Sequence, residues 1–157
     1  MGTSRVPELI DALVTRLTSD LADLPVIVSD GYGVTDDPSD FLMIGVDAPW
    51  SPETAFSASS DQEAGPGATT RPRNENGSVT CSAYSQNGDG DQKAARDNAY
   101  AYMAAVENLL RTDPNLGIAP GGNFVAQMGQ TQRLSQDQDA NGANAVLVFD
   151  VKFFARI

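Results

Sequence analysis

The clearest pattern in the chain is a strand, a turn and a long helix between residues 78 and 112. Residues 78–85 alternate apolar and polar side chains, which is typical of a strand with one buried face. After the turn, apolar residues recur every three or four positions, which predicts the buried face of a helix. Asp89 and Asp91 stand where carboxylates accept hydrogen bonds from the first turn, and Asp113-Pro114 ends the helix. The apolar face consists of Ala95, Ala99, Tyr102, Met103, Val106, Leu109 and Leu110.

The N-terminal part of the chain predicts a second helix and two strands. Residues 6–21 repeat apolar side chains on one side, and the charged side chains fall elsewhere. The polar face of this helix is acidic, which favours packing on a sheet over binding to a membrane surface. Strand patterns follow at 26–34 and 41–46, and the Asp, Pro and Ser residues between them predict a turn. We therefore expect these two strands to form a hairpin.

The end of the chain, residues 145–157, carries the clearest strand pattern. One face is wholly apolar up to the last residue. The other face places Asp150, Lys152 and Arg156 beside Phe154. A face that mixes charge with a large ring suits an interface better than open solvent.

A weaker strand pattern at 122–133 is followed by a polar stretch, 137–142, that resembles the first half of a calcium loop. The twelfth position of such a loop would be Val148, where an EF-hand needs a glutamate. Asn141-Gly142 is a strong two-residue hairpin signal and explains the same residues. We therefore expect a hairpin here, and no metal or other cofactor.

Residues 48–76 lose all sustained periodicity and are rich in Pro, Gly, Ser, Thr and Ala. A structureless insertion of this length in a small domain is usually a binding arm, a lid or a disordered segment. This arm carries two large apolar rings, Trp50 and Phe56. The rings either dock on another chain or fold back on their own core, and the sequence leaves both alternatives open.

These elements follow one another as helix, two strands, arm, strand, helix and two strands. The order predicts a single α+β domain over residues 1–157, with the arm 48–76 inserted between strands. We expect a mainly antiparallel sheet of about four or five strands with both helices packed on it. A chain of 157 residues is long enough to bury such a core.

The charge balance restricts the partners. The chain has 10 Lys and Arg against 21 Asp and Glu, a net charge of -11, and no histidine. Such a surface repels phosphate backbones and anionic lipids, so we expect no affinity for membranes or for nucleic acid through its backbone. An acidic surface would still let DNA pass along it without binding the DNA. The first residues show no signal-peptide pattern, and no apolar run approaches the roughly 20 residues that span a bilayer.

The sequence offers few candidates for catalysis. The one cysteine, Cys81, falls in a strand pattern with no histidine to activate it, and we expect a small buried hydrophobe. Each Asp is more simply a turn, cap or surface residue, because no strand end or cleft selects a catalytic pair. We therefore expect no enzyme. A buried pair of Asp side chains with raised pKa values would support the alternative of a carboxylate-dependent hydrolase or isomerase.

Three stretches carry a resemblance to a known family. They are DFLMIGVD at 40–47, GDGDQKAARDNAYAYMAAVENLLRTDPNLG at 88–117, and GANAVLVFDVKFFARI at 142–157. With them, most of the chain except residues 48–76 resembles the tail terminator proteins of phages with long, non-contractile tails, particularly those that infect actinobacteria. The likeness lies in the texture of strands and helix and not in catalytic signatures.

The resemblance implies a structural protein of the virion that is assembled in the host cytoplasm as a homo-oligomeric ring, a hexamer. The ring would sit on the head-proximal end of the tail tube, in the neck, and stop tube polymerisation. It would contact the major tail tube protein and the head-side connector or stopper protein, and so join tail to head. Genome DNA would pass through its lumen without sequence-specific binding.

Ring formation is a heterologous contact that closes, so one patch must meet a different patch on the neighbour. We assign one patch to the outer face of the last strand, and the arm to neighbouring subunits or the tube protein. A further candidate lies on the side of the long helix opposite its apolar face. The expected interface residues are Trp50, Phe56, Tyr100, Asp150, Lys152, Phe154 and Arg156.

A head-tail connector or stopper protein is the alternative within phage assembly, because it would share the size and the acidity. The final long strand after a helix favours the terminator.

Overall fold

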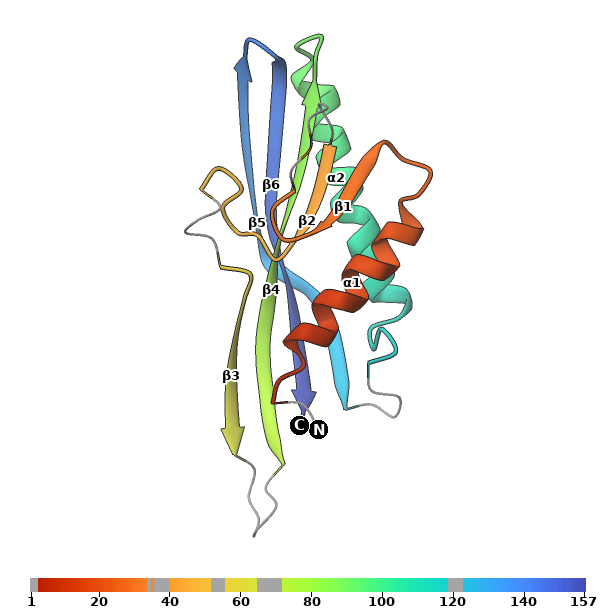
Figure 1. Ribbon diagram of the computed structural model, residues 1–157, viewed down its shortest axis with the longest axis vertical. Helices are drawn as coiled ribbons and strands as arrows, with labels where there is room; N and C mark the ends of the chain where they lie inside the picture. Colours follow the sequence, from red (N-terminus) through yellow and green to blue (C-terminus); the bar gives the residue numbers. More distant parts are fainter. Residues whose placement is uncertain (1–2, 34, 36–39, 52–55, 65–71, 119–122) are drawn as a thin grey trace.

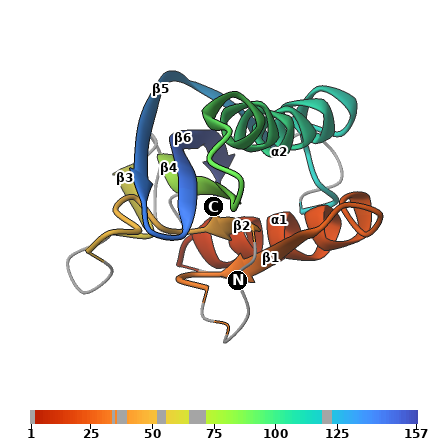
Figure 2. The same cartoon turned by 90° about the horizontal axis from the view of Figure 1, so that it is seen from above.

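Two helices lie against one face of a sheet in the computed structural model, which describes residues 3–33, 35, 40–51, 56–64, 72–118 and 123–157 (Figures 1 and 2). In this part of the chain the sheet has six strands, and the fold is α+β as the sequence predicts. The elements in chain order are α1 (Val6–Asp20), β1 (Val26–Asp30), β2 (Asp40–Ile44), β3 (Ala58–Ala64), β4 (Arg73–Asn87), α2 (Gln92–Thr112), β5 (Phe124–Asp139) and β6 (Gly142–Arg156).

The sheet is mostly antiparallel. Its strands follow one another as β1, β2, β4, β6 and β5, and β3 also pairs with β4. β2 and β3 share one edge of β4, since β2 pairs with residues 81–84 and β3 with residues 73–79. The β3–β4 pair reaches past both helices at one end of the molecule (Figure 1). We call the half of the sheet around β3 and residues 73–79 of β4 the projecting half. Val79 and Phe153 are still buried on its helix side, and only the ends of β3 and β4 extend past the helices.

Both predicted helices are confirmed. α2 packs on β4, β5 and β6, and α1 packs on β1, β2 and β4. Asp91 caps α2 by accepting a hydrogen bond from the Ala94 N–H at 3.2 Å, whereas the Asp89 N–H donates to Asn87 Oδ1. The expected apolar face of α2 is buried at Ala95, Ala99, Tyr102, Val106, Leu109 and Leu110, with Met103 partly buried.

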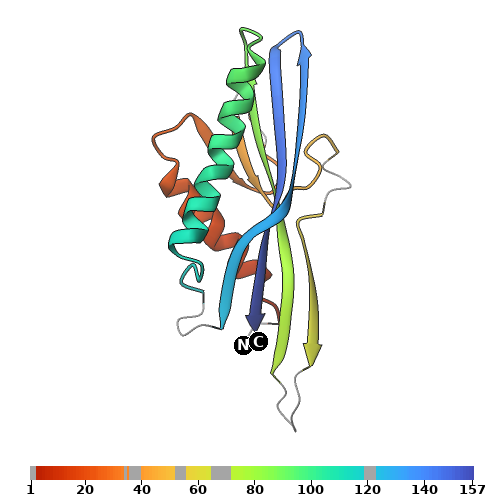
Figure 3. The ribbon, with the colours of Figure 1, turned by 180° about the vertical axis from the view of Figure 1, so that it is seen from behind.

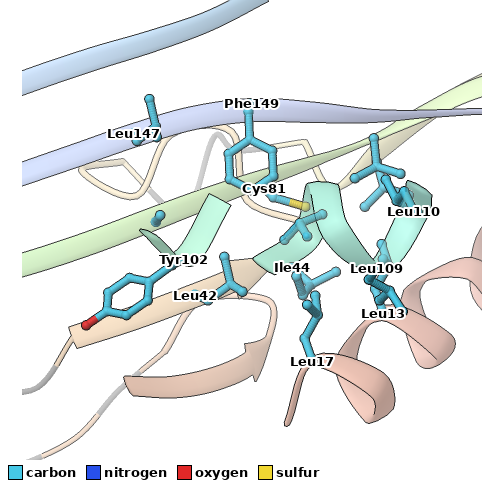
Figure 4. Close-up of a cluster of buried hydrophobic side chains, with 14 of the residues drawn as sticks. Leu13, Leu17, Leu42, Ile44, Cys81, Tyr102, Leu109, Leu110, Leu147 and Phe149 are labelled. Carbon is cyan, nitrogen blue, oxygen red and sulfur yellow. The ribbon is translucent and has the colours of Figure 1, made fainter. Parts of the chain in front are cut away.

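The core lies between this helical layer and the sheet (Figure 4). Cys81 of β4 is fully buried in it, as the sequence predicts. Burial raises the pKa of the Cys81 thiol to about 12, and the Gly45 backbone hydrogen bond does not offset this. The core is built from residues of both helices and the central strands, among them Leu13, Leu17, Leu42, Ile44, Leu109, Leu147 and Phe149.

The expected hairpin of residues 26–34 and 41–46 is wrong. β1 and β2 pair in parallel, with Val26 beside Asp40 and Asp30 beside Ile44. The turn residues between them predict that the chain changes direction, but not that the next strand runs antiparallel. Because Val26 pairs with Asp40, the second strand starts level with the first.

Two strand predictions also need correction. The sheet has six strands instead of four or five, because residues 58–64 of the expected arm form β3 and residues 73–76 belong to β4. β3 is exposed along nearly all its length, so its sequence has no alternation that would predict a strand. Residues 52–55 and 65–71 of the arm lie outside the described residues, and its role in binding stays a prediction.

The expected hairpin between the last two strands is confirmed, with its loop one residue earlier. Asp139 pairs with Gly142, so Ala140 and Asn141 form the turn. β5 continues to Asp139, well beyond the predicted end at 133. Its register shifts between Met128 and Gln132, and Figure 3 shows the strand bending midway.

Candidate protein-interaction face

The side of the sheet opposite the helices is open in its projecting half. Along β4, β5 and β6 in this half, one set of alternate side chains is buried on the helix side and the other set is outside. No described element covers the outer set. We call it the open face: Ser59, Asp61 and Glu63 of β3; Asn74, Asn76 and Ser78 of β4; Lys152, Phe154 and Arg156 of β6; and Val125 and Gln127 of β5.

The strand register arranges these side chains in rows across the face. One row runs from Asp61 through Asn76 and Phe154 to Val125. The rows on either side contain Lys152 and Arg156 respectively. Phe154 and Val125 therefore form an exposed apolar strip with a cation above and below it. This is the mixed face that the sequence predicts for the last strand.

The two cations are not neutralised within the described residues. Lys152 and Arg156 are both exposed, and neither forms an ion pair in the part of the chain that the structure describes. The carboxylates on the same face, Asp61 and Glu63, belong to β3, which is separated from β6 by β4. The chain has a net charge of -11, so most of its surface is acidic. Lys152 and Arg156, on either side of the apolar strip, are complementary to such an acidic surface on another copy.

The described residues between β2 and β3 are held at Thr80 of β4. β2 and β3 lie in line along β4, and we call the described residues between them, 45–51 and 56–57, the Trp50 loop. The Thr80 N–H donates to Ser57 O at 3.0 Å, and Thr80 O accepts from the Gly45 and Val46 N–H groups at 2.7 and 2.9 Å. Asp47 Oδ1 accepts from the Phe56 N–H at 2.9 Å. The base of the loop is thus fixed to the sheet.

The two rings of this loop do not fold back on the core. The exposed fraction is 63% for Trp50 and 75% for Phe56. Of the two alternatives that the sequence leaves open, packing on their own core is therefore wrong, and docking on another chain stays a prediction.

The remaining expected interface residues fall in different places. Asp150 lies on the same side of β6 as Phe154 but is half-buried, level with the bend in β5. Tyr100 is exposed on α2, across the sheet from the open face. The structure brings Lys152, Phe154 and Arg156 together, and it does not bring Tyr100 to them.

Sequence reasoning missed two contributors. Val125 joins the open face only through its register with Phe154, which a single weak strand pattern cannot give.

Glu75 lies inside the expected arm, yet it is fully buried and anchors the projecting half. Its carboxylate accepts hydrogen bonds from Ser4 Oγ and from the Arg5 N–H, the latter at 2.8 Å, and from β3 through Ser60 and Gln62. Burial raises its pKa, but these donors outweigh burial and leave the pKa below its ordinary value.

Two acidic residues outside the open face, Asp40 and Asp139, make structural contacts. Asp40 accepts hydrogen bonds from Ser85 Oγ, the Gln86 N–H and the Tyr102 hydroxyl. In the stretch that resembles a calcium loop, Asp139 accepts from the Asn141 N–H and Asn144 Nδ2. Among the described residues, no three His, Cys, Asp or Glu side chains gather as a metal site. The helices of this part of the chain also include none long and apolar enough to cross a membrane.

No protein-family model matches the chain, and no curated protein sequence shows significant similarity to it.

Proposed function

We propose that the protein is a tail terminator of a phage with a long, non-contractile tail. In this proposal it forms a hexameric ring on the head-proximal end of the tail tube, stops tube polymerisation and joins the tail to the head-side connector. The proposal rests on the resemblance of three stretches of the sequence. The observation that supports it best is the open face, where an exposed apolar strip lies between two unneutralised cations.

The open face and the Trp50 loop suit contacts with other proteins of the tail. Aromatic side chains and Arg are enriched at protein interfaces relative to the rest of the surface. The partners we assign are neighbouring subunits and the tube protein. The acidic surface elsewhere is compatible with genome DNA passing through the ring without sequence-specific binding.

The test is deletion of the gene from the phage that carries it, followed by electron microscopy of the tails. A terminator predicts tubes of uncontrolled length, restored to uniform length when the wild-type gene is supplied. Tubes of uniform length that fail to join heads would favour a connector or stopper instead. Normal, head-joined tails would contradict both functions.

A further inference from the structure

The two edge strands of the sheet, β1 and β5, each have an unpaired outer edge in the half of the sheet that contains β1 and β2. β1 pairs only with β2 among the described strands, and β5 pairs only with β6. Near the start of β5 the outer edge is occupied, because the Ala126 N–H donates to Pro114 O at 2.8 Å. From Gln132 to Gln136, by contrast, the outer edge has no backbone partner in the described part of the chain.

These two edges lie at the same level. The row that contains Ile27 continues through Phe41, Tyr84 and Val146 to Ser135. β1 and β5 also run in opposite directions, since β1 is parallel to β2 and three antiparallel pairings follow across the sheet. A second copy rotated about an axis along the strands would therefore place its β1 antiparallel to β5 of the first. Unpaired edges are ready templates for such pairing, and neither segment contains a proline.

Exposed apolar side chains accompany both edges. Leu24, Ile27 and Tyr32 lie on β1 or beside its ends. On the other side Leu134 is exposed on β5, and Tyr100 lies one helical turn after Arg96, whose guanidinium donates to Gln136 Oε1 at 3.1 Å. Five of the nine large exposed apolar residues in the described chain therefore border these two edges. The other four belong to the open face and the Trp50 loop.

Two exposed charged side chains lie at these edges, on different faces of the sheet. Asp30 is exposed at the end of β1, in the row of Gln132. Arg133, next along β5, is exposed and forms no ion pair with a described residue. With Ile27 opposite Ser135, Asp30 falls opposite Gln132 on the helix side of the sheet, whereas Arg133 falls opposite Ser29 on the other side, so these two charges neither attract nor repel each other directly.

We infer that β1 of one copy pairs with the part of β5 after its bend, Gln132–Asp139, of the next copy. Ile27 would lie opposite Ser135, and this contact would build the ring. The contact is heterologous, because two different edges meet, so successive copies close into a ring when the rotation is suitable. The inference rests on the proposed function for the ring, but it names the edges that join, and Tyr100 becomes part of the contact. It leaves the open face free for the tube protein.

Disulfide trapping tests this pairing in the full chain and in assembled tails. Ile27 and Ser135 fall on the same face of the sheet, so Ile27→Cys with Ser135→Cys should give a ladder of linked species after mild oxidation. Each step should disappear on reduction. The native Cys81 is fully buried and does not contribute. The matched control is Ile27→Cys with Gln136→Cys, which places the second thiol on the opposite face, where disulfide geometry is not met. A pairing shifted by two residues would move the strongest ladder to Arg133→Cys or Asp137→Cys.

Two outcomes would overturn the edge pairing. One is the absence of linked species for all three same-face pairs, both in concentrated protein and in purified tails that contain the variants. The other is an equal ladder from the Gln136→Cys control. Tube length separates this failure from failure of the function. If the gene controls tube length but the ladder is absent, the ring uses other surfaces and the terminator proposal stands.

Discussion

The Tyr102 hydroxyl of α2 donates to Asp40 Oδ2 at the first residue of β2, so one hydrogen bond ties the long helix to the sheet. Burial, together with this bond to Asp40, raises the pKa of Tyr102 above its ordinary value of 10.0. Asp40 also holds Ser85 Oγ at 2.9 Å and the Gln86 N–H at 3.0 Å. A single carboxylate thus fixes the end of β2 against both β4 and α2.

Replacing Tyr102 with Phe should lower the free energy of unfolding by about 1.5–3 kcal/mol, the usual contribution of a hydrogen bond to a charged group. Because the folded chain keeps the phenol neutral, this residue's contribution is present below pH 10 and is lost as the pH rises above it. Urea unfolding at pH 7 measures the loss. Tyr100→Phe, on the exposed side of the same helix, is the control and should change stability by about 0.5 kcal/mol or less. Equal effects would contradict the role of Asp40.

Gly142 begins β6 at a place where no larger residue fits. Its φ is +122°, and a Cβ there would lie 2.1 Å from Asn87 O. Gly142→Ala should therefore move the hairpin away from the end of β4 and lower the free energy of unfolding by about 2–3 kcal/mol. Gly117→Ala is the control, because Gly117 also has a positive φ but no atom lies within 4 Å of its Cβ position. Its cost should be near 1 kcal/mol. Thermal unfolding of the two variants checks the difference.

Glu75 should make the projecting half sensitive to acid. Its folded pKa is below the ordinary 4.5, so its stabilising contribution is present above pH 4.5 and is lost as the pH falls through the lower, folded value. Glu75→Gln should lower stability at pH 7 by about 1–3 kcal/mol and flatten the decline below pH 4.5. Unfolding measured between pH 3 and pH 7 tests both effects. Glu63→Gln, an exposed change on β3, should reproduce the wild-type curve; if Glu75→Gln does so too, the anchor is misassigned.

Adjacent phenylalanines of β6 separate stability from assembly. Phe153 is 4% exposed and stacks on Phe124 with ring centroids 5.8 Å apart, whereas Phe154 is 43% exposed on the open face. Phe153→Ala should lower the free energy of unfolding by about 3–5 kcal/mol. Phe154→Ala should leave it within about 0.5 kcal/mol and instead reduce incorporation of the protein into tails. Unfolding curves and quantitative blots of purified tails measure the two effects. An unstable Phe154→Ala would show that this ring serves the fold.

The sequence predicts the elements whose side chains have one buried face. Both helices and the last strand follow from apolar periodicity, and so does the outward direction of Lys152, Phe154 and Arg156. β3 does not, because Ser59 to Ala64 are exposed on both sides and carry no pattern. The parallel pairing of β1 and β2 is not predictable from turn residues, since these favour a change of direction whatever the next strand does.

The pairing register between strands is a second feature that the sequence does not predict. Val125 and Phe154 are 29 positions apart, and only the pairing of β5 with β6 shows that they form one strip. Trp50 and Phe56 were recognisable as unusual rings in a polar segment. Their exposure is seen only in the structure, because no local pattern distinguishes a docked ring from an exposed one.

The length of tail tubes assembled with a charge-reversed open face tests the account most directly. Lys152→Glu with Arg156→Glu alters two exposed side chains that form no ion pair with any described residue, so the chain should fold with wild-type stability. If the open face seats the protein on the tube, electron microscopy should show tubes of broad, excessive length, as in tails that lack the gene. Tails of wild-type length, with the folded variant present in them, would contradict the claim that this face makes the terminating contact.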